Sequence, residues 1–110
     1  MTSDYIRSRD DIAACVLLYA ILATAMADWG LTVIGLDMGA VELNPMMAPV
    51  FAQGPLYAAA VKATSPAICL LMYAALRRDP YARKWALATL LVTATISMVP
   101  VVWNLGQLAK

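Results

Sequence analysis

Six polar side chains stand out in a chain that is otherwise strongly apolar. They comprise two carboxylates, one ammonium group, two amides and a hydroxyl: Asp28, Thr32, Glu42, Asn44, Lys62 and Asn104. Ionisable groups inside a membrane span are costly, so they are candidates for function. Gathered together, these groups would hold two negative charges and one positive charge. A proton or a small cation could supply the missing positive charge, although the pattern identifies no particular metal.

The composition places the chain among membrane proteins. Hydrophobic residues make up 63% of its 110 residues and charged residues 14%, whereas soluble domains are about 45–50% apolar and about 25% charged. The net charge of +1 gives no clustered basic face, so nucleic-acid binding is not expected. The chain has no histidine, the commonest metal ligand and general base. We therefore predict a single membrane domain over residues 1–110, without a cofactor.

Three apolar stretches approach or exceed the roughly 20 residues that cross a bilayer as a helix. They cover about residues 12–36, 55–76 and 85–105. Between the first two, Asn44-Pro45 begins a run of turn-forming residues that predicts a turn with a short interfacial helix. The predicted fold is an all-α integral membrane bundle of three transmembrane helices, with a short interfacial segment after the first.

Basic residues predict the orientation of these spans. Cytoplasmic segments of membrane proteins are enriched in lysine and arginine, and the segment 37–54 has neither. We therefore expect an inner or plasma membrane protein with a cytoplasmic N-terminus and an external C-terminus. The residues that carry this bias are Arg7, Arg9, Arg77, Arg78, Arg83 and Lys84.

A secretory signal peptide is the competing interpretation of the N-terminal region. Arg7 and Arg9 precede an apolar run, and Ala23-Thr24-Ala25 resembles a cleavage site. However, apolar sequence resumes at residues 29–36 and completes a full-length span. The sequence therefore favours a membrane helix here.

Asp28 and Lys62 are predicted to form an ion pair between the first two spans. Each lies seven or eight residues from the outer end of its span, which is about 10–12 Å at 1.5 Å per residue. Antiparallel neighbouring helices would bring them to one level. The second span has only six Leu, Ile or Val residues, so neutralising Lys62 would help it insert. The pair could serve only to fix helix register, or it could form part of a ligand or proton site.

The first span also carries a stripe of polar and small residues. Thr24, Asp28 and Thr32 recur every four residues and share one helix face. Gly35 and Gly39 extend nearly the same stripe as a Gly-x3-Gly pair, which would let another helix approach closely. We expect this face to pack against protein, whether as a simple helix–helix seam or as the wall of a site.

Three more polar residues are expected near the outer surface. Glu42 and Asn44 follow Gly39, and Asn104 lies at the outer end of the third span at nearly the same level. These side chains could complete a cluster with Asp28 and Lys62. Alternatively, Glu42 and Asn44 belong to a solvated loop that makes local hydrogen bonds.

The pattern Asp-x3-Thr, followed by Gly-x2-Glu-x-Asn-Pro, a lysine in the next span and an asparagine ending the third, carries a family resemblance. It resembles a widespread family of small prokaryotic membrane proteins known as a domain of unknown function. The similarity covers about residues 12–106, and residues 39–45 are its most specific part. The resemblance implies a three-helix membrane domain and implies no activity.

These observations favour a non-enzymatic membrane protein whose polar cluster binds or senses a small ion, or stabilises a partner. Besides the lipid bilayer, a second copy or another membrane protein is expected as a partner, because three short helices make a small core. A phage-type holin, which permeabilises the membrane, is the alternative of similar size and span count. An intramembrane enzyme is a third interpretation, with Ser65 near Lys62 as the one nucleophile–base arrangement.

Overall fold

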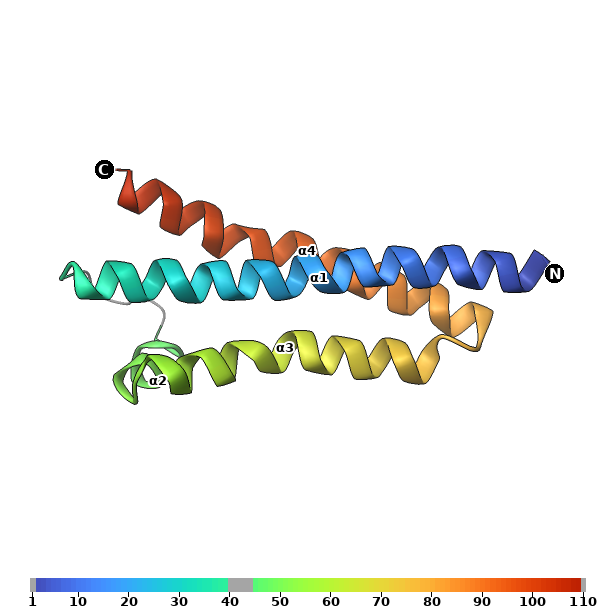
Figure 1. Ribbon diagram of the computed structural model, residues 1–110, viewed down its shortest axis with the longest axis horizontal. Helices are drawn as coiled ribbons and strands as arrows, with labels where there is room; N and C mark the ends of the chain where they lie inside the picture. Colours follow the sequence, from blue (N-terminus) through green and yellow to red (C-terminus); the bar gives the residue numbers. More distant parts are fainter. Residues whose placement is uncertain (1, 40–44, 110) are drawn as a thin grey trace.

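The computed structural model describes residues 2–39 and 45–109, and within these ranges it is helical with no strand. Three long helices are present: α1 (Thr2–Asp37), α3 (Pro55–Leu76) and α4 (Pro80–Leu108) (Figure 1). The short helix α2 (Ala48–Ala52) lies between α1 and α3. Each long helix is long and apolar enough to cross a membrane. The predicted all-α bundle of three transmembrane helices is confirmed.

Helix ends follow the local sequence. Gly39 has a φ of +91° and Gly54 a φ of +121°, backbone angles that favour glycine. They lie just beyond the end of α1 and just before the start of α3. At the start of α4, the Asp79 side chain accepts a hydrogen bond of 3.0 Å from the backbone N–H of Tyr81, while Pro80 occupies the first turn. This is the usual chemistry of a helix N-terminus.

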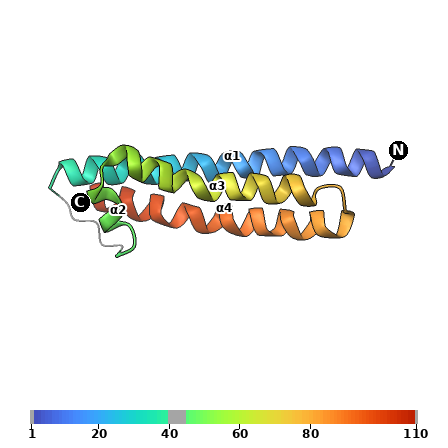
Figure 2. The ribbon, with the colours of Figure 1, turned by 90° about the horizontal axis from the view of Figure 1, so that it is seen from below.

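The three long helices run up, down and up. Helices α1 and α4 point the same way, and α3 runs against them (Figures 1 and 2). The N-terminus and the α3–α4 turn therefore lie at one end of the bundle, called here the inner end, and the C-terminus lies at the outer end. Helix α1 packs most extensively against α4 and then α3, while α3 and α4 touch least.

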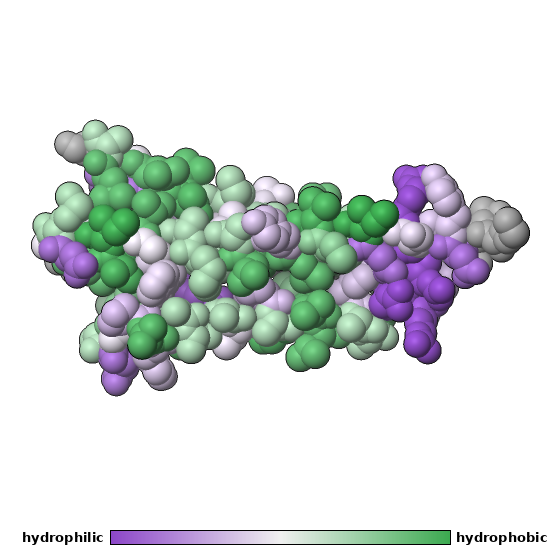
Figure 3. All heavy atoms as spheres, in the orientation of Figure 1, coloured by the Kyte–Doolittle hydropathy of each residue, from purple (hydrophilic) through white to green (hydrophobic). Residues whose placement is uncertain are grey.

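The helices extend beyond the predicted spans. Helix α1 has 36 residues, which is about 54 Å at 1.5 Å per residue, whereas the hydrocarbon core of a bilayer is about 30 Å thick. The predicted span 12–36 is thus the apolar part of a longer helix that starts at Thr2. Hydrophilic side chains gather at the inner end, beyond the apolar middle (Figure 3).

A seven-residue repeat marks the buried face of α1. Ala14, Ile21 and Asp28 are its buried residues and lie seven positions apart. Such a repeat keeps one seam of a helix against its neighbours. The core between the helices contains Ala14, Ile21, Cys69, Tyr73, Ala86 and Leu90. Asp28 therefore occupies a position where this seam would otherwise place an apolar residue.

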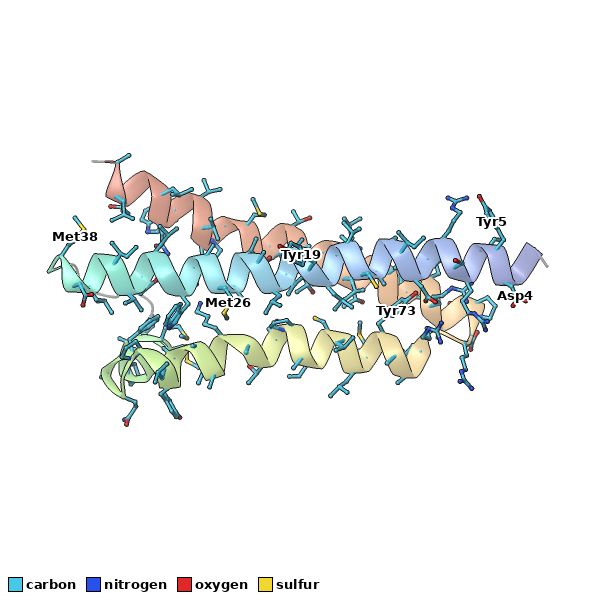
Figure 4. The ribbon with its side chains drawn as sticks, in the orientation of Figure 1. Asp4, Tyr5, Tyr19, Met26, Met38 and Tyr73 are labelled. Carbon is cyan, nitrogen blue, oxygen red and sulfur yellow. The ribbon has the colours of Figure 1, made fainter. Side chains whose placement is uncertain are left out.

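Large apolar side chains cover the outside of the bundle. Tyr19, Ile68 and Val99 are each more than 60% exposed, and Tyr19 points away from the neighbouring helices in the side-chain view (Figure 4). A helix that is apolar all round is typical of a membrane span. The exposed surface therefore suits contact with lipid.

Candidate functional site

Asp28 lies at the centre of a polar cluster in the outer half of the bundle. It is only 6% exposed. The ammonium group of Lys62, from α3, donates to Asp28 Oδ2 in a direct ion pair. The amide of Asn104, from α4, donates to Asp28 Oδ1 at 2.6 Å. One carboxylate on α1 is thus bonded to both other long helices.

Thr32 joins the same cluster one turn along α1. Asn104 Nδ2 lies 3.3 Å from Thr32 Oγ1 as well as bonding to Asp28. Four of the six polar residues predicted to gather are therefore linked by hydrogen bonds. We call Asp28, Thr32, Lys62 and Asn104 the outer cluster. Glu42 and Asn44, the other two, lie outside the described residues.

The two glycines of the predicted stripe lie in different surroundings. Gly35 is half-buried within α1. Gly39 is exposed beyond the end of the helix, and a side-chain carbon added there would meet no heavy atom of the described residues within 4 Å. Its N–H donates to the carbonyl of Leu36 at 3.0 Å. Gly39 thus lies in the turn that follows α1, and its role in packing against another helix stays a prediction.

Polar contacts continue from the outer cluster to the middle of the bundle and stop there. Thr24 Oγ1 lies 2.7 Å from Ser97 Oγ and also donates to the carbonyl of Ala20 at 2.8 Å. The next buried residues toward the inner end are Ile21 and Leu90, at 1% and 0% exposure. An apolar layer therefore closes the inner side of the polar region.

A second polar cluster lies at the inner end. Arg77 forms a bidentate ion pair with Asp11, with its Nε 3.2 Å from Oδ1 and its Nη2 2.5 Å from Oδ2. The hydroxyl of Tyr73 donates to the same Oδ1 at 2.8 Å, and Tyr73 lies on the side of α3 toward α1 (Figure 4). Arg83 Nε donates to Asp10 Oδ2 at 2.8 Å. We call Asp10, Asp11, Tyr73, Arg77 and Arg83 the inner cluster.

Arg83 is as deeply buried as Tyr73 in the inner cluster, each at 5% exposure. Besides Asp10, it donates from Nη1 to the carbonyl of Arg77 at 2.9 Å, which ties the α3–α4 turn to α1. The hydrogen bonds that Arg77 donates to the Asp11 carboxylate raise the pKa of the Arg77 guanidinium above its ordinary value. Arginine is charged at any physiological pH, so this end of the bundle holds permanent ion pairs.

Sequence reasoning missed the inner cluster. In the sequence, the arginines predict only the orientation of the spans, and Asp10 and Asp11 lie outside the predicted first span. The signal was present nevertheless. The predicted topology already placed two aspartates and a group of arginines at the same end of the bundle, where opposite charges are expected to pair.

Trp29 makes a further contact that the sequence did not indicate. Its indole N–H donates to the carbonyl of Pro55 at 2.7 Å. Trp29 follows Asp28 directly, and Pro55 is the first residue of α3. The α1–α3 contact at the outer end is thus held by both the Asp28–Lys62 pair and this hydrogen bond.

The chemistry available to the outer cluster follows from its charge balance. Within the described residues, Asp28 and Lys62 neutralise each other, and no group of three or more His, Cys, Asp or Glu side chains is placed to hold a metal ion. Lys62 is engaged by Asp28, whereas Ser65 lies on the exposed side of α3. The described part of the outer cluster is therefore neutral overall, with its one carboxylate bonded to both neighbouring long helices.

Comparison with known proteins identifies a family. No curated protein and no solved structure matches the chain. A family model described as "Domain of unknown function (DUF5658)" matches residues 19–110. This match includes all four residues of the outer cluster and most of each long helix. The chain therefore belongs to the DUF5658 family of domains of unknown function.

Proposed function

We propose that this protein is a non-enzymatic membrane module in which the outer cluster is a lock between three helices, opened by a proton or a small cation at Asp28. The observation that carries the proposal is the bonding of Asp28, whose two oxygens accept from Lys62 of α3 and Asn104 of α4. Neutralising this carboxylate would weaken both links at once, because hydrogen bonds to a charged group are the stronger kind.

The charges around the lock are few. Among the described residues of the outer cluster, α1 contributes Asp28 and α3 contributes Lys62, while α4 contributes the uncharged Asn104. A proton on Asp28 would leave Lys62 without its counter-ion. A cation such as Na⁺ would compete with the Lys62 ammonium for the same oxygens. Either event favours separation of α3 from α1 at the outer end.

Sensing fits this site better than transport. The apolar layer of Ile21 and Leu90, at 1% and 0% exposure, separates the outer cluster from the inner end. A conducting path would need polar groups or water at that level. This layer also gives no support to a pore through a single copy, which a holin-like activity within one bundle would require.

We also propose that the inner end faces the cytoplasm and the outer end faces away from it. The support is the gathering of Arg7, Arg9 and the basic α3–α4 turn at one end of the bundle (Figure 1). The positive-inside bias assigns that end to the cytoplasm of an inner or plasma membrane. The outer cluster would then respond to conditions outside the cell.

Trp29 offers a direct test, because its indole bonds to Pro55 beside the Asp28–Lys62 pair. A W85F/W103F variant leaves Trp29 as the single tryptophan. In lipid nanodiscs, we expect lower pH or added Na⁺ to increase quenching of Trp29 by acrylamide, since the outer end opens to water. The same chain with D28N should be quenched strongly and without dependence on pH or Na⁺. Equal quenching of both proteins under all conditions would overturn the proposal.

A further inference from the structure

The segment from the end of α3 to the start of α4 carries two kinds of basic residue. Arg77 and Arg83 are bonded to Asp11 and Asp10 within the bundle. Arg78 and Lys84 are exposed, and neither forms an ion pair with another residue in the described ranges. Asp79, which lies between them in the sequence, has its carboxylate engaged by the backbone of Tyr81. Two positive charges of this segment are therefore left for a partner outside the chain.

Aromatic residues lie beside these charges. Tyr81 and Trp85 are 72% and 58% exposed, and their rings meet edge to face with centroids 6.4 Å apart. They are one turn apart on α4. At 100° per residue, they lie on the side of α4 opposite Arg83, with Lys84 beside them. Exposed tyrosine and tryptophan at a span end favour the headgroup region of a bilayer.

The position along the bundle agrees with that environment. Arg77 directly follows α3 and lies fifteen residues after Lys62, about 22 Å along the helix axis. Lys62 itself lies about 10 Å from the outer end of α3. Together these distances place the inner cluster roughly one hydrocarbon thickness from the outer end of α3. Arg78 directly follows Arg77, and Lys84 directly follows Arg83. Both residues therefore lie at the level of lipid phosphates rather than in the hydrocarbon.

We infer that Arg78 and Lys84, framed by Tyr81 and Trp85, bind the phosphate headgroup of an anionic phospholipid at the inner end. The aromatic pair packs against the glycerol region, and the two cations contact the phosphate. Polybasic segments beside a membrane helix attract anionic lipids in this way. This inference is independent of the proposed function of the outer cluster.

Native mass spectrometry of the full-length protein tests the inference. The protein is reconstituted with equimolar phosphatidylglycerol and phosphatidylcholine, and the lipids it retains are counted. We expect preferential retention of phosphatidylglycerol, reduced about fivefold for each charge removed in R78Q and K84Q. The charge-preserving double variant R78K/K84R should retain it as the wild type does. Higher salt should weaken retention.

Two results would overturn the lipid site. One is equal retention of phosphatidylglycerol by the wild type and by R78Q/K84Q, with both proteins showing the same helix content by circular dichroism. The other is full displacement of the lipid by water-soluble glycerol phosphate, which would indicate a site for a free phosphate compound. A W85L variant separates the aromatic contribution, because it should lower retention while leaving both charges in place.

Discussion

Asp10 and Asp28 lie on one face of α1, eighteen residues and five helical turns apart, and each accepts a hydrogen bond from α4. Arg83 bonds to Asp10 at 2.8 Å and Asn104 to Asp28 at 2.6 Å. The separation along α1 is about 27 Å at 1.5 Å per residue. The two parallel helices are thus joined through carboxylates of α1 at two well-separated levels, one at the inner end and one in the outer half of the bundle.

Two of the side-chain contacts between α1 and α4 have the same sequence offset. Asp10 bonds to Arg83 and Thr24 to Ser97, with an offset of 73 residues in both cases. A constant offset means that α1 and α4 run in parallel without slipping. The Asp28–Asn104 contact, at an offset of 76, shows a small drift at the outer end. Polar contacts therefore fix the register of two helices whose apolar surfaces could slide.

The first prediction concerns the Asp28–Lys62 pair. D28N and K62M should each lower the stability of the bundle, because each leaves one buried group without its charged partner. In soluble proteins such a loss costs about 3–5 kcal/mol. The double variant D28N/K62M should recover part of this loss, since no unpaired charge remains. Unfolding by sodium dodecyl sulfate in mixed micelles measures all three.

The control for these three variants is D37N, which removes an exposed carboxylate from the outer end of α1. It should leave stability nearly unchanged. Single variants as stable as D37N would show that the ion pair contributes nothing to folding. A double variant that loses the full sum of the two single effects would show that the two residues are not coupled.

The sequence predicted the Asp28–Lys62 pair because helix geometry ties position to depth. A fixed rise per residue converts two sequence distances into the same level in the membrane. The same reasoning placed Asn104 at nearly the level of Glu42 and Asn44 and left its contact with Asp28 as one possibility. Depth does not show which face of a helix is packed. The polar stripe of Thr24, Asp28 and Thr32 indicates that face on α1. Helices α3 and α4 are apolar all round, so periodicity does not separate their lipid-facing side from their packed side.

The inner cluster escaped prediction for a different reason. Hydropathy predicts a first span that begins at about residue 12, which leaves Asp10 and Asp11 in an N-terminal tail. In the structure α1 continues as a helix through them, and this rigid extension brings both carboxylates to Arg83 and Arg77. Hydrophobicity marks where lipid begins, but it does not mark where the helix begins.

The second prediction concerns Asn104. N104L removes the donor to Asp28 Oδ1 and leaves a buried carboxylate oxygen without its partner, a loss of about 1–3 kcal/mol. The matched control is Q107L, which removes an exposed amide one turn further along α4. T24V provides a second comparison. It removes a neutral contact to Ser97, and such contacts in membrane proteins average about 0.6 kcal/mol.

The expected order of destabilisation is therefore N104L, then T24V, then Q107L. Detergent unfolding of the three variants under identical conditions measures it. If N104L and Q107L behaved alike, Asn104 would not hold α4 to Asp28.

The third prediction concerns Tyr73 in the inner cluster. Y73F removes the hydroxyl that donates to Asp11 and should cost about 0.5–1.5 kcal/mol, because Arg77 still holds the carboxylate. Y5F is the control, since Tyr5 is exposed at the same end. R77Q should cost more than Y73F, because it removes two donors and a charge. Equal stability of Y73F and the wild type would mean that Arg77 alone suffices at Asp11.

The fourth prediction tests the orientation and the apolar layer with cysteine labelling in a C15A/C69A background. Ser8 and Met38 are exposed at opposite ends of α1. In intact cells, M38C should react with a membrane-impermeant maleimide and S8C should react only after lysis, because the positive-inside bias places Ser8 in the cytoplasm. I21C should stay unreactive in both preparations, since Ile21 is 1% exposed in the apolar layer. Labelling of S8C in intact cells would reverse the orientation, and labelling of I21C would show that water crosses the bundle.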